Sequence, residues 1–133
     1  MTRMALIASL IFLPTNVLAA TDGYNCTINE IRELSTTGSL PTHSGIYSRL
    51  IGSTFSINRV TGQVIGLPFS TEAYREAKIL DRGSQSNSFK LVITSYPPNI
   101  WVKYIYVKEF QEGESKPFWG TDDGDKIYAG ICK

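Results

Sequence analysis

The stretch Ile100–Phe110, IWVKYIYVKEF, is the longest β-strand signal in the 133-residue chain. Side chains of a strand alternate between its two faces, and here both faces are largely apolar. A strand of this kind is typical of the centre of a sheet, or of a strand that lines a cavity on one side. One face would carry Ile100, Val102, Tyr104 and Tyr106, and the other Trp101, Lys103, Ile105 and Val107.

Shorter segments with strand character lie on both sides of this stretch. Turn-forming residues separate them at intervals of roughly 8–12 residues, a spacing that favours an antiparallel barrel or sandwich. Gly62 supplies the positive φ of the clearest hairpin. We predict an all-β fold of about seven or eight strands. The segments are Tyr24–Ile28, Ile46–Ile51, Thr54–Asn58, Val64–Ile65, Phe89–Ile93, Pro117–Trp119 and Lys126–Cys132.

Two segments fit a helix as well as a strand. Thr27-x-x-Glu30 matches a helix capping box, but we predict a strand because Cys26 has to meet the last strand. Glu72–Leu80 (EAYREAKIL) is rich in helix-forming residues, and a strand over Ala77–Leu80 is equally compatible with it. One short helix therefore remains open.

Two polar stretches are interpreted as turns. Asp81–Asn87 (DRGSQSN) is predicted to be a connection between elements. Asp122–Asp125 (DDGD) lacks the alternating oxygen ligands and distal Glu of a calcium loop. We predict a hairpin turn there, with Gly124 in the conformation of positive φ.

The first nineteen residues have the pattern of a secretory signal peptide. Arg3 provides a positive charge, Met4–Leu13 is apolar but too short to span a bilayer, and Val17-Leu18-Ala19 resembles a cleavage site. We therefore expect residues 1–19 to be a signal peptide and residues 20–133 a single β domain, exported to the periplasm or outside the cell. No later apolar run is long enough to span a bilayer, so we expect no stable membrane insertion after cleavage.

Cys26 and Cys132 are the only cysteines, and both belong to the predicted mature chain. An oxidising compartment favours a disulfide between them, which would join the start of the fold to its end. Their Cα atoms would then lie about 4.4–6.8 Å apart, so the first and last strands should be neighbours. The absence of a C-x-x-C pair disfavours a redox site, and two thiols with a distant histidine do not form a zinc site.

The charge pattern disfavours nucleic acid as a partner. Removal of the leader takes Arg3 from the thirteen basic residues and leaves twelve basic against twelve acidic residues. A net charge near zero, without a basic stripe, provides no long-range attraction to nucleic acid or to an anionic membrane. We also find no phosphate-binding loop and predict no metal and no cofactor.

His43 is the only histidine and the only good candidate for a general base. It lies in the polar loop Ser35–Gly45, and the chain has no G-x-S-x-G or other catalytic motif around a serine. We interpret it as a solvated loop histidine and expect the protein not to be an enzyme. A small hydrolase would need His43 in a cleft beside a serine or a carboxylate.

Aromatic residues are concentrated in the last third of the chain. Most are expected in the core, because aromatic side chains bury large areas. Those that remain exposed would form a contact surface for a protein or a sugar. We predict a candidate binding face made of Tyr96, Trp101 and Trp119.

Several short motifs together resemble a small group of uncharacterised exported proteobacterial proteins. The resemblance implies an exported location and no particular activity. In size, leader and small β character the chain is also broadly similar to periplasmic lysozyme inhibitors, although their inhibitory-loop motifs are not matched. The motifs are the early Cys26, Phe55-x-Ile57-x-Arg59-x-Thr61-Gly62-x-x-x-Gly66, Asp81-Arg82-Gly83-Ser84, Lys116-Pro117-Phe118 and Gly130-x-Cys132.

These observations favour a non-catalytic exported binding or inhibitor-like module whose partner is a protein or a glycan. The alternative is a carrier for a small apolar ligand, held inside a barrel behind the apolar stretch Ile100–Phe110. A small hydrolase is the third hypothesis.

Overall fold

The structure, a computed structural model, describes residues 22–72 and 75–133. The predicted signal peptide, residues 1–19, lies outside the described residues. Eight strands and one 3-10 helix, η1, make up the described part of the chain. They are β1 (Gly23–Glu33), η1 (Ile46–Leu50), β2 (Thr54–Asn58), β3 (Val64–Ile65), β4 (Arg75–Ser84), β5 (Asn87–Ser95), β6 (Val102–Val107), β7 (Lys116–Thr121) and β8 (Lys126–Cys132).

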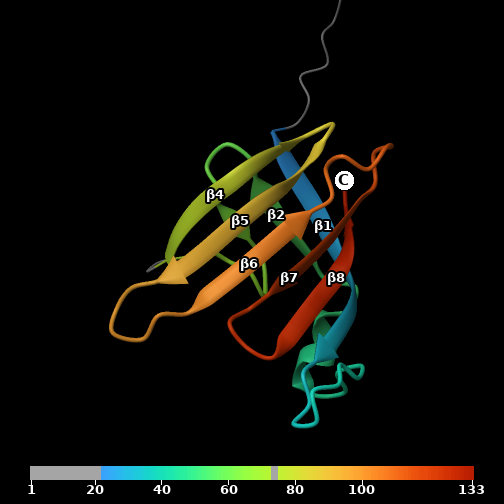
Figure 1. Ribbon diagram of the computed structural model, residues 1–133, viewed down its shortest axis with the longest axis vertical. Helices are drawn as coiled ribbons and strands as arrows, with labels where there is room; N and C mark the ends of the chain where they lie inside the picture. Colours follow the sequence, from blue (N-terminus) through green and yellow to red (C-terminus); the bar gives the residue numbers. More distant parts are fainter. Residues whose placement is uncertain (1–21, 73–74) are drawn as a thin grey trace, which may run out of the picture.

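All eight strands belong to one antiparallel sheet in the order β3-β2-β1-β8-β7-β6-β5-β4. The sheet curls into a half-barrel, with β3 and β4 as its two unpaired edges (Figure 1). This arrangement confirms the all-β prediction and places β6 in the interior of the sheet, between β5 and β7. No helix among the described residues is long and apolar enough to cross a membrane.

The disulfide joins the first and last strands, as predicted. Cys26 lies opposite Cys132 in the ladder between β1 and β8, and the two are bonded. Their neighbours Asn25 and Lys133 exchange both backbone hydrogen bonds, each of 2.9 Å. The cysteines therefore occupy the adjacent non-hydrogen-bonded position, where strands approach most closely. Their Cα atoms are 3.9 Å apart, closer than the predicted range.

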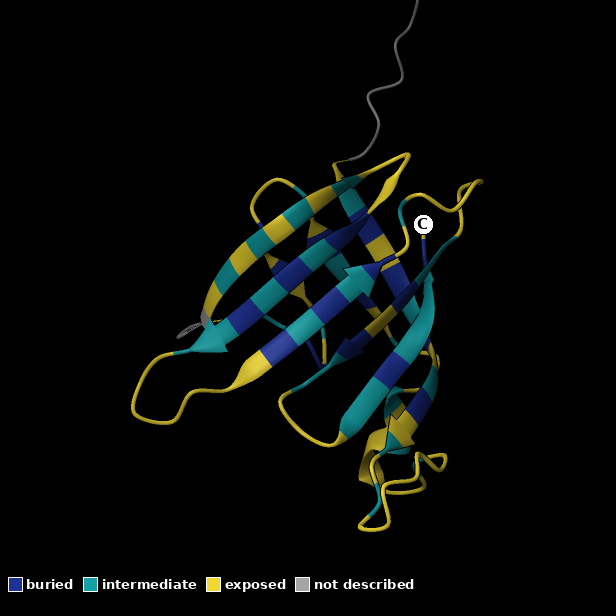
Figure 2. Ribbon diagram, viewed as in Figure 1, coloured by how far each residue is buried: buried dark blue, intermediate teal, exposed yellow. Residues whose placement is uncertain are grey.

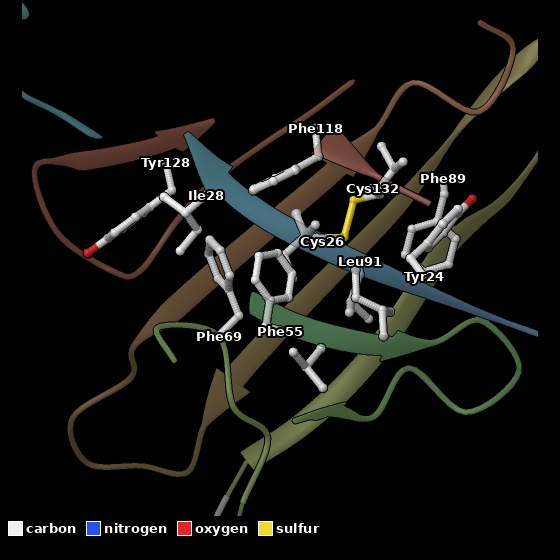
Figure 3. Packing of buried hydrophobic residues seen from close by; sticks show 14 of the residues in the cluster. Tyr24, Cys26, Ile28, Phe55, Phe69, Phe89, Leu91, Phe118, Tyr128 and Cys132 are labelled. Carbon is white, nitrogen blue, oxygen red and sulfur yellow. A yellow bond between two sulfur atoms is a disulfide. The ribbon is translucent and has the colours of Figure 1, made fainter. Parts of the chain in front are cut away.

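The core fills the concave side of the half-barrel. Inward side chains of the strands are buried while their sequence neighbours are half-buried or exposed, which produces the alternating colours of Figure 2. Four rings pack at the centre in tilted or edge-to-face pairs, with centroids 5.0–5.5 Å apart. These rings are Phe55, Phe69, Phe118 and Tyr128, shown in Figure 3 beside the disulfide.

The predicted strand at Ile46–Ile51 is wrong, because residues Ile46–Leu50 form the 3-10 helix η1. A strand at Ile46–Ile51 would have to pair with β1, but other residues already form backbone hydrogen bonds with that edge of β1. The N–H of Glu33 donates to the carbonyl of Pro41, and that of Gly52 to the carbonyl of Ile28. Thr42 also bridges to Arg32, and the N–H of His43 donates to the carbonyl of Ile31. The chain from Ser44 to Ile51 pairs with no strand and loops out at one end of the half-barrel (Figure 1).

The two ambiguous segments are both strands. Thr27–Glu30 continues β1, so the strand prediction is confirmed. The segment Glu72–Leu80 contributes to β4, because Ala77 and Ile79 turn toward the core and pair with β5. Packing against the sheet outweighs helix propensity here. Residues 73–74 of this segment lie outside the described part.

Two turn predictions need correction. The connection Asp81–Asn87 is much shorter than predicted, because β4 runs to Ser84 and β5 begins at Asn87. In the β7–β8 turn, Asp123 (φ 81°) and not Gly124 takes the left-handed conformation. Its carboxylate accepts a 2.7 Å hydrogen bond from the N–H of Val102, which holds it in place. Gly62 does have positive φ, as predicted (78°).

Candidate functional site

Three aromatic side chains lie together on the outer face of the barrel, and we call them the aromatic stripe: Tyr104, Tyr106 and Trp119. Tyr106 on β6 lies directly opposite Trp119 on β7, with ring centroids 6.0 Å apart and ring planes 28° apart. Tyr104, two residues along β6, has its centroid 5.3 Å from that of Trp119. Trp119 is 40% exposed.

The alternation of strand side chains explains the position of the stripe. Ile105 and Val107 point into the core and are fully buried, so Tyr104 and Tyr106 must point outward. On β7, Phe118 is buried, and its neighbour Trp119 therefore faces out. Lys103 also lies on the inner side of β6, where its ammonium donates to the carbonyl of Pro68.

Aliphatic and charged residues surround the stripe. Lys90 lies opposite Tyr106 on β5, and Val92 lies opposite Tyr104. On the other side, Ala129 of β8 lies opposite Trp119. Partial burial raises the pKa of Tyr104, and the positive charge of Lys90 opposes that rise. The stripe therefore combines aromatic surface, aliphatic surface and a cation.

The structure separates the predicted binding residues into two groups. Tyr96 (58% exposed), Trp101 (50%) and Trp119 (40%) all reach the surface. Tyr96 and Trp101 belong to the loop between β5 and β6, where the N–H of Trp101 donates to Ser95 Oγ at 2.7 Å. Tyr106 is the residue of β6 that lies opposite Trp119. Trp101 precedes Tyr106 by five residues, or roughly 16 Å along the strand, and so lies apart from Trp119.

His43 is not the solvated loop histidine that the sequence indicated. Its side chain is 8% exposed, and Nδ1 is hydrogen-bonded to the Glu33 carboxylate. Its Nε2 is buried without a hydrogen-bond partner. A Cβ atom added to Gly45 would lie 2.7 Å from Nε2, so the backbone of Gly45 covers this nitrogen.

The ion pairs around His43 attach the outer loop to the barrel. Lys126 of β8 lies 3.7 Å from Glu33 and 3.0 Å from Asp125. Its ammonium is also 4.7 Å from the centroid of the Tyr47 ring of η1. The hydrogen bond between Lys126 and Asp125 raises the pKa of Lys126 and lowers that of Asp125. His43 thus belongs to a network between β1, β8 and η1.

The aspartates of the β7–β8 turn are used in separate contacts. Asp122 accepts a 2.7 Å hydrogen bond from the Tyr128 hydroxyl, Asp123 bonds the N–H of Val102, and Asp125 pairs with Lys126. In residues 22–72 and 75–133, no three His, Cys, Asp or Glu side chains gather in a way that could hold a metal ion.

Another polar cluster bridges the open side of the half-barrel. The Tyr24 hydroxyl donates to Glu109, whose carboxylate lies 3.4 Å from the guanidinium of Arg59. Arg59 also stacks over the Tyr24 ring at 4.9 Å. Arg59 and Arg82 donate to each other's backbone carbonyls at 3.0 and 3.1 Å. These contacts tie the end of β2 to the end of β4.

Sequence reasoning grouped Trp119 with Tyr96 and Trp101 and did not place Tyr104 and Tyr106 beside it. The two-residue period already places Tyr104 and Tyr106 on one face of the same strand. Their contact with Trp119 depends on the register between β6 and β7, which local sequence patterns do not specify.

Comparison with known proteins found no matching family model, no matching curated protein and no matching solved structure.

Proposed function

We propose that the protein is an exported, non-catalytic binding or inhibitor-like module that contacts its partner through the aromatic stripe, in the periplasm or outside the cell. One observation carries the proposal: Trp119 is 40% exposed and packs beside Tyr104 and Tyr106, so that three aromatic rings share one outer face of the sheet. The partner is a protein or a glycan, since both are bound through exposed tryptophan and tyrosine rings.

The position of the stripe on β6 and β7 supports this proposal. Both strands are hydrogen-bonded on their two sides and lie in the interior of the sheet. Rings that are already ordered lose little conformational entropy when a partner binds, so more of the contact energy appears as affinity. The disulfide is consistent with an oxidising compartment.

The environment of His43 favours a non-catalytic role over that of a small hydrolase. The Glu33 carboxylate orients the ring through Nδ1, as the third member of a catalytic triad would. A general base, however, needs its second nitrogen within hydrogen-bond reach of the proton it abstracts. Gly45 covers Nε2 of His43 in this conformation.

The packing of the barrel favours the outer surface over an internal carrier site. A carried apolar ligand needs an internal cavity of roughly 300 Å³ or more. The contacts among Phe55, Phe69, Phe118 and Tyr128 fill the centre of the concave side (Figure 3). The outer rings are better placed for a ligand.

Affinity capture with matched variants tests the proposal. Mature chain (residues 20–133), its Trp119→Ala variant and its Phe110→Ala variant would be immobilised. Each would be exposed to the exported proteins of the producing cells and to insoluble peptidoglycan, chitin and cellulose. Phe110 is a suitable control because it is also partly exposed but lies outside the stripe. The wild type and Phe110→Ala should retain the same partner, and Trp119→Ala should lose at least tenfold in retention.

Tyr106→Ala provides a second test, because it removes the ring that packs against Trp119 without changing Trp119 itself. It should also weaken retention. Equal retention by the wild type and both stripe variants would contradict the proposal, as would the absence of any retained protein or polymer.

A further inference from the structure

Strand β4 is the last strand of the sheet, and none of the other described strands pairs with its outer edge. Its other edge pairs with β5. Near its end, Arg59 donates to the carbonyl of Arg82. The turn before β3 packs on the inner face, where a Cβ on Gly62 would meet the side chains of Leu91, Ile79 and Ala77 at 3.1–3.4 Å. Among the residues that the structure describes, no strand pairs with the outer edge of the stretch Arg75–Ile79.

The exposed side chains on this edge carry opposite charges. Glu76 and Lys78 are both exposed and share the outer face, whereas Ala77 and Ile79 turn toward the core. Within the described part of the chain, neither Glu76 nor Lys78 takes part in an ion pair or a side-chain hydrogen bond. A charged residue usually protects a strand edge, because pairing would bring like charges together.

We propose that two copies of the chain associate through this edge, with the two β4 strands antiparallel and Ala77 on the two-fold axis. In this register Glu76 of each copy lies opposite Lys78 of the second copy, so that two ion pairs form across the interface. Opposite charges that face each other directly stabilise a strand pair. The pattern Glu-x-Lys is therefore complementary to itself around Ala77.

The hydrogen-bonding pattern permits this register. Backbone N–H and C=O groups of a strand point alternately to its two edges. The N–H of Ser95 donates to Trp101 on the β6 side, so the alternate residues Val92 and Thr94 point their backbone groups to β4, where Lys78 and Glu76 lie opposite them. The backbone groups of Ala77 therefore point to the free edge, and in this register they face those of Ala77 in the second copy. Registers centred on Glu76 or on Lys78 would place two like charges on the axis. Among these three centres, only Ala77 matches both the charges and the hydrogen bonds.

Two features of the sheet limit the assembly to a dimer. A β-bulge between Ile79 and Asp81 interrupts the regular edge directly after the paired stretch. The opposite edge of the sheet, β3, spans only Val64–Ile65 and offers no comparable surface. A two-fold axis uses each β4 edge once, so the contact closes on itself and does not lead to fibres.

Sedimentation velocity of the mature chain, at about 10–300 µM, tests this proposal in the concentration range of a small interface. The wild type should change from monomer to dimer with concentration. Lys78→Glu and Glu76→Lys each replace two attractive pairs by two repulsive ones and should raise the dimer dissociation constant at least tenfold. The double variant Glu76→Lys/Lys78→Glu exchanges the charges and should restore the dimer.

Glu114→Lys is the matched control, because it makes the same charge change on an exposed loop residue far along the chain from β4. It should sediment like the wild type. A wild type that is monomeric at every concentration would overturn the proposal. So would a dimer that Lys78→Glu leaves intact, or one that the charge exchange does not restore. Because the stripe lies on β6 and β7, these results are independent of the partner-binding test.

Discussion

At the scale of single residues, the most informative groups are two buried tyrosine hydroxyls. Tyr24 donates to Glu109 where the half-barrel is open, and Tyr128 donates to Asp122 below the β7–β8 turn. Both rings belong to the core. Burial is the main reason why the pKa of each hydroxyl lies above its ordinary value, and the hydrogen bond to a carboxylate raises it further.

These shifts predict a loss of stability at alkaline pH. In the unfolded chain both hydroxyls ionise near pH 10, while in the folded protein they keep their protons to higher pH. Their contribution to stability is thus complete below about pH 10 and is lost as the pH rises from there toward the raised pKa. The measurement is thermal unfolding of the wild type and of Tyr24→Phe/Tyr128→Phe between about pH 8 and 11.5.

The double variant should lose about 1 kcal/mol per hydroxyl at neutral pH, since each change removes one hydrogen bond. It should then decline less steeply than the wild type above pH 10. Tyr96→Phe, which alters an exposed ring, is the control and should follow the wild type. Parallel alkaline curves for the wild type and the double variant would show that this explanation is wrong.

The candidate site was predictable only in part at this scale. The concentration of aromatic residues in the last third pointed to Trp119, whose exposure agrees with the prediction of a contact face. The same reasoning grouped it with Tyr96 and Trp101, which lie in the β5–β6 loop instead. Adjacent positions in space depend on strand register, and register is determined by the packing of the whole sheet.

At the scale of secondary structure, β1 organises the sheet. Its first half pairs with β2 on one edge, and the strand pairs with β8 along the other. A β-bulge between Ile28 and Glu30 changes the register of the second ladder. At this bulge the strands approach so closely that a Cβ on Gly130 would lie 1.9 Å from the carbonyl oxygen of Thr27.

Gly130→Ala should therefore destabilise the protein strongly, by about 3 kcal/mol, because the backbone of β1 or β8 has to move. Gly124→Ala is the matched control: the closest atom to its added Cβ, Asp122 Oδ1, is 3.7 Å away. Its effect should stay within about 0.5 kcal/mol. Denaturant unfolding measures both, and equal stabilities of the two variants would contradict the close approach at Gly130.

Strands with clear alternation were predictable from sequence, and those without a clear pattern were not. Thr54–Asn58 and Phe89–Ile93 alternate cleanly and are found in β2 and β5. Ile46–Ile51 has comparable β-forming residues but lacks a partner strand, because Pro41 and Gly52 already bond to that edge of β1. Glu72–Leu80 contributes to β4 despite its helix-forming composition, since β5 and the core provide its contacts.

At the scale of the whole molecule, the disulfide connects the two ends of the described chain. Cys26 and Cys132 are 106 residues apart, and the strands that carry them are neighbours. Strands β4 to β8 form one antiparallel meander, and β1 to β3 form a shorter one. The disulfide joins the two meanders where β1 lies beside β8. A cross-link of this span acts mainly by reducing the freedom of the unfolded chain.

Loss of the bond should cost about 4–5 kcal/mol in the chain-entropy model, a large share of the 5–15 kcal/mol typical of a small domain. Guanidinium unfolding of the oxidised wild type and of Cys26→Ala/Cys132→Ala measures this difference. Reductant should lower the midpoint of the wild type and leave that of the double variant unchanged. An unchanged wild-type midpoint would indicate that the cross-link contributes little.

The inner face of the half-barrel carries the packed core, and we propose that the outer aromatic stripe contacts a partner. Phe118 and Trp119 are adjacent on β7 and test this division directly, because the first is 3% and the second 40% exposed. The measurement is the free energy of unfolding of Phe118→Ala and Trp119→Ala. Phe118→Ala should lose about 3–5 kcal/mol. Trp119→Ala should lose about 1 kcal/mol, from the lost ring contacts. Equal losses would contradict this division between the two faces, since Trp119 would then be part of the core.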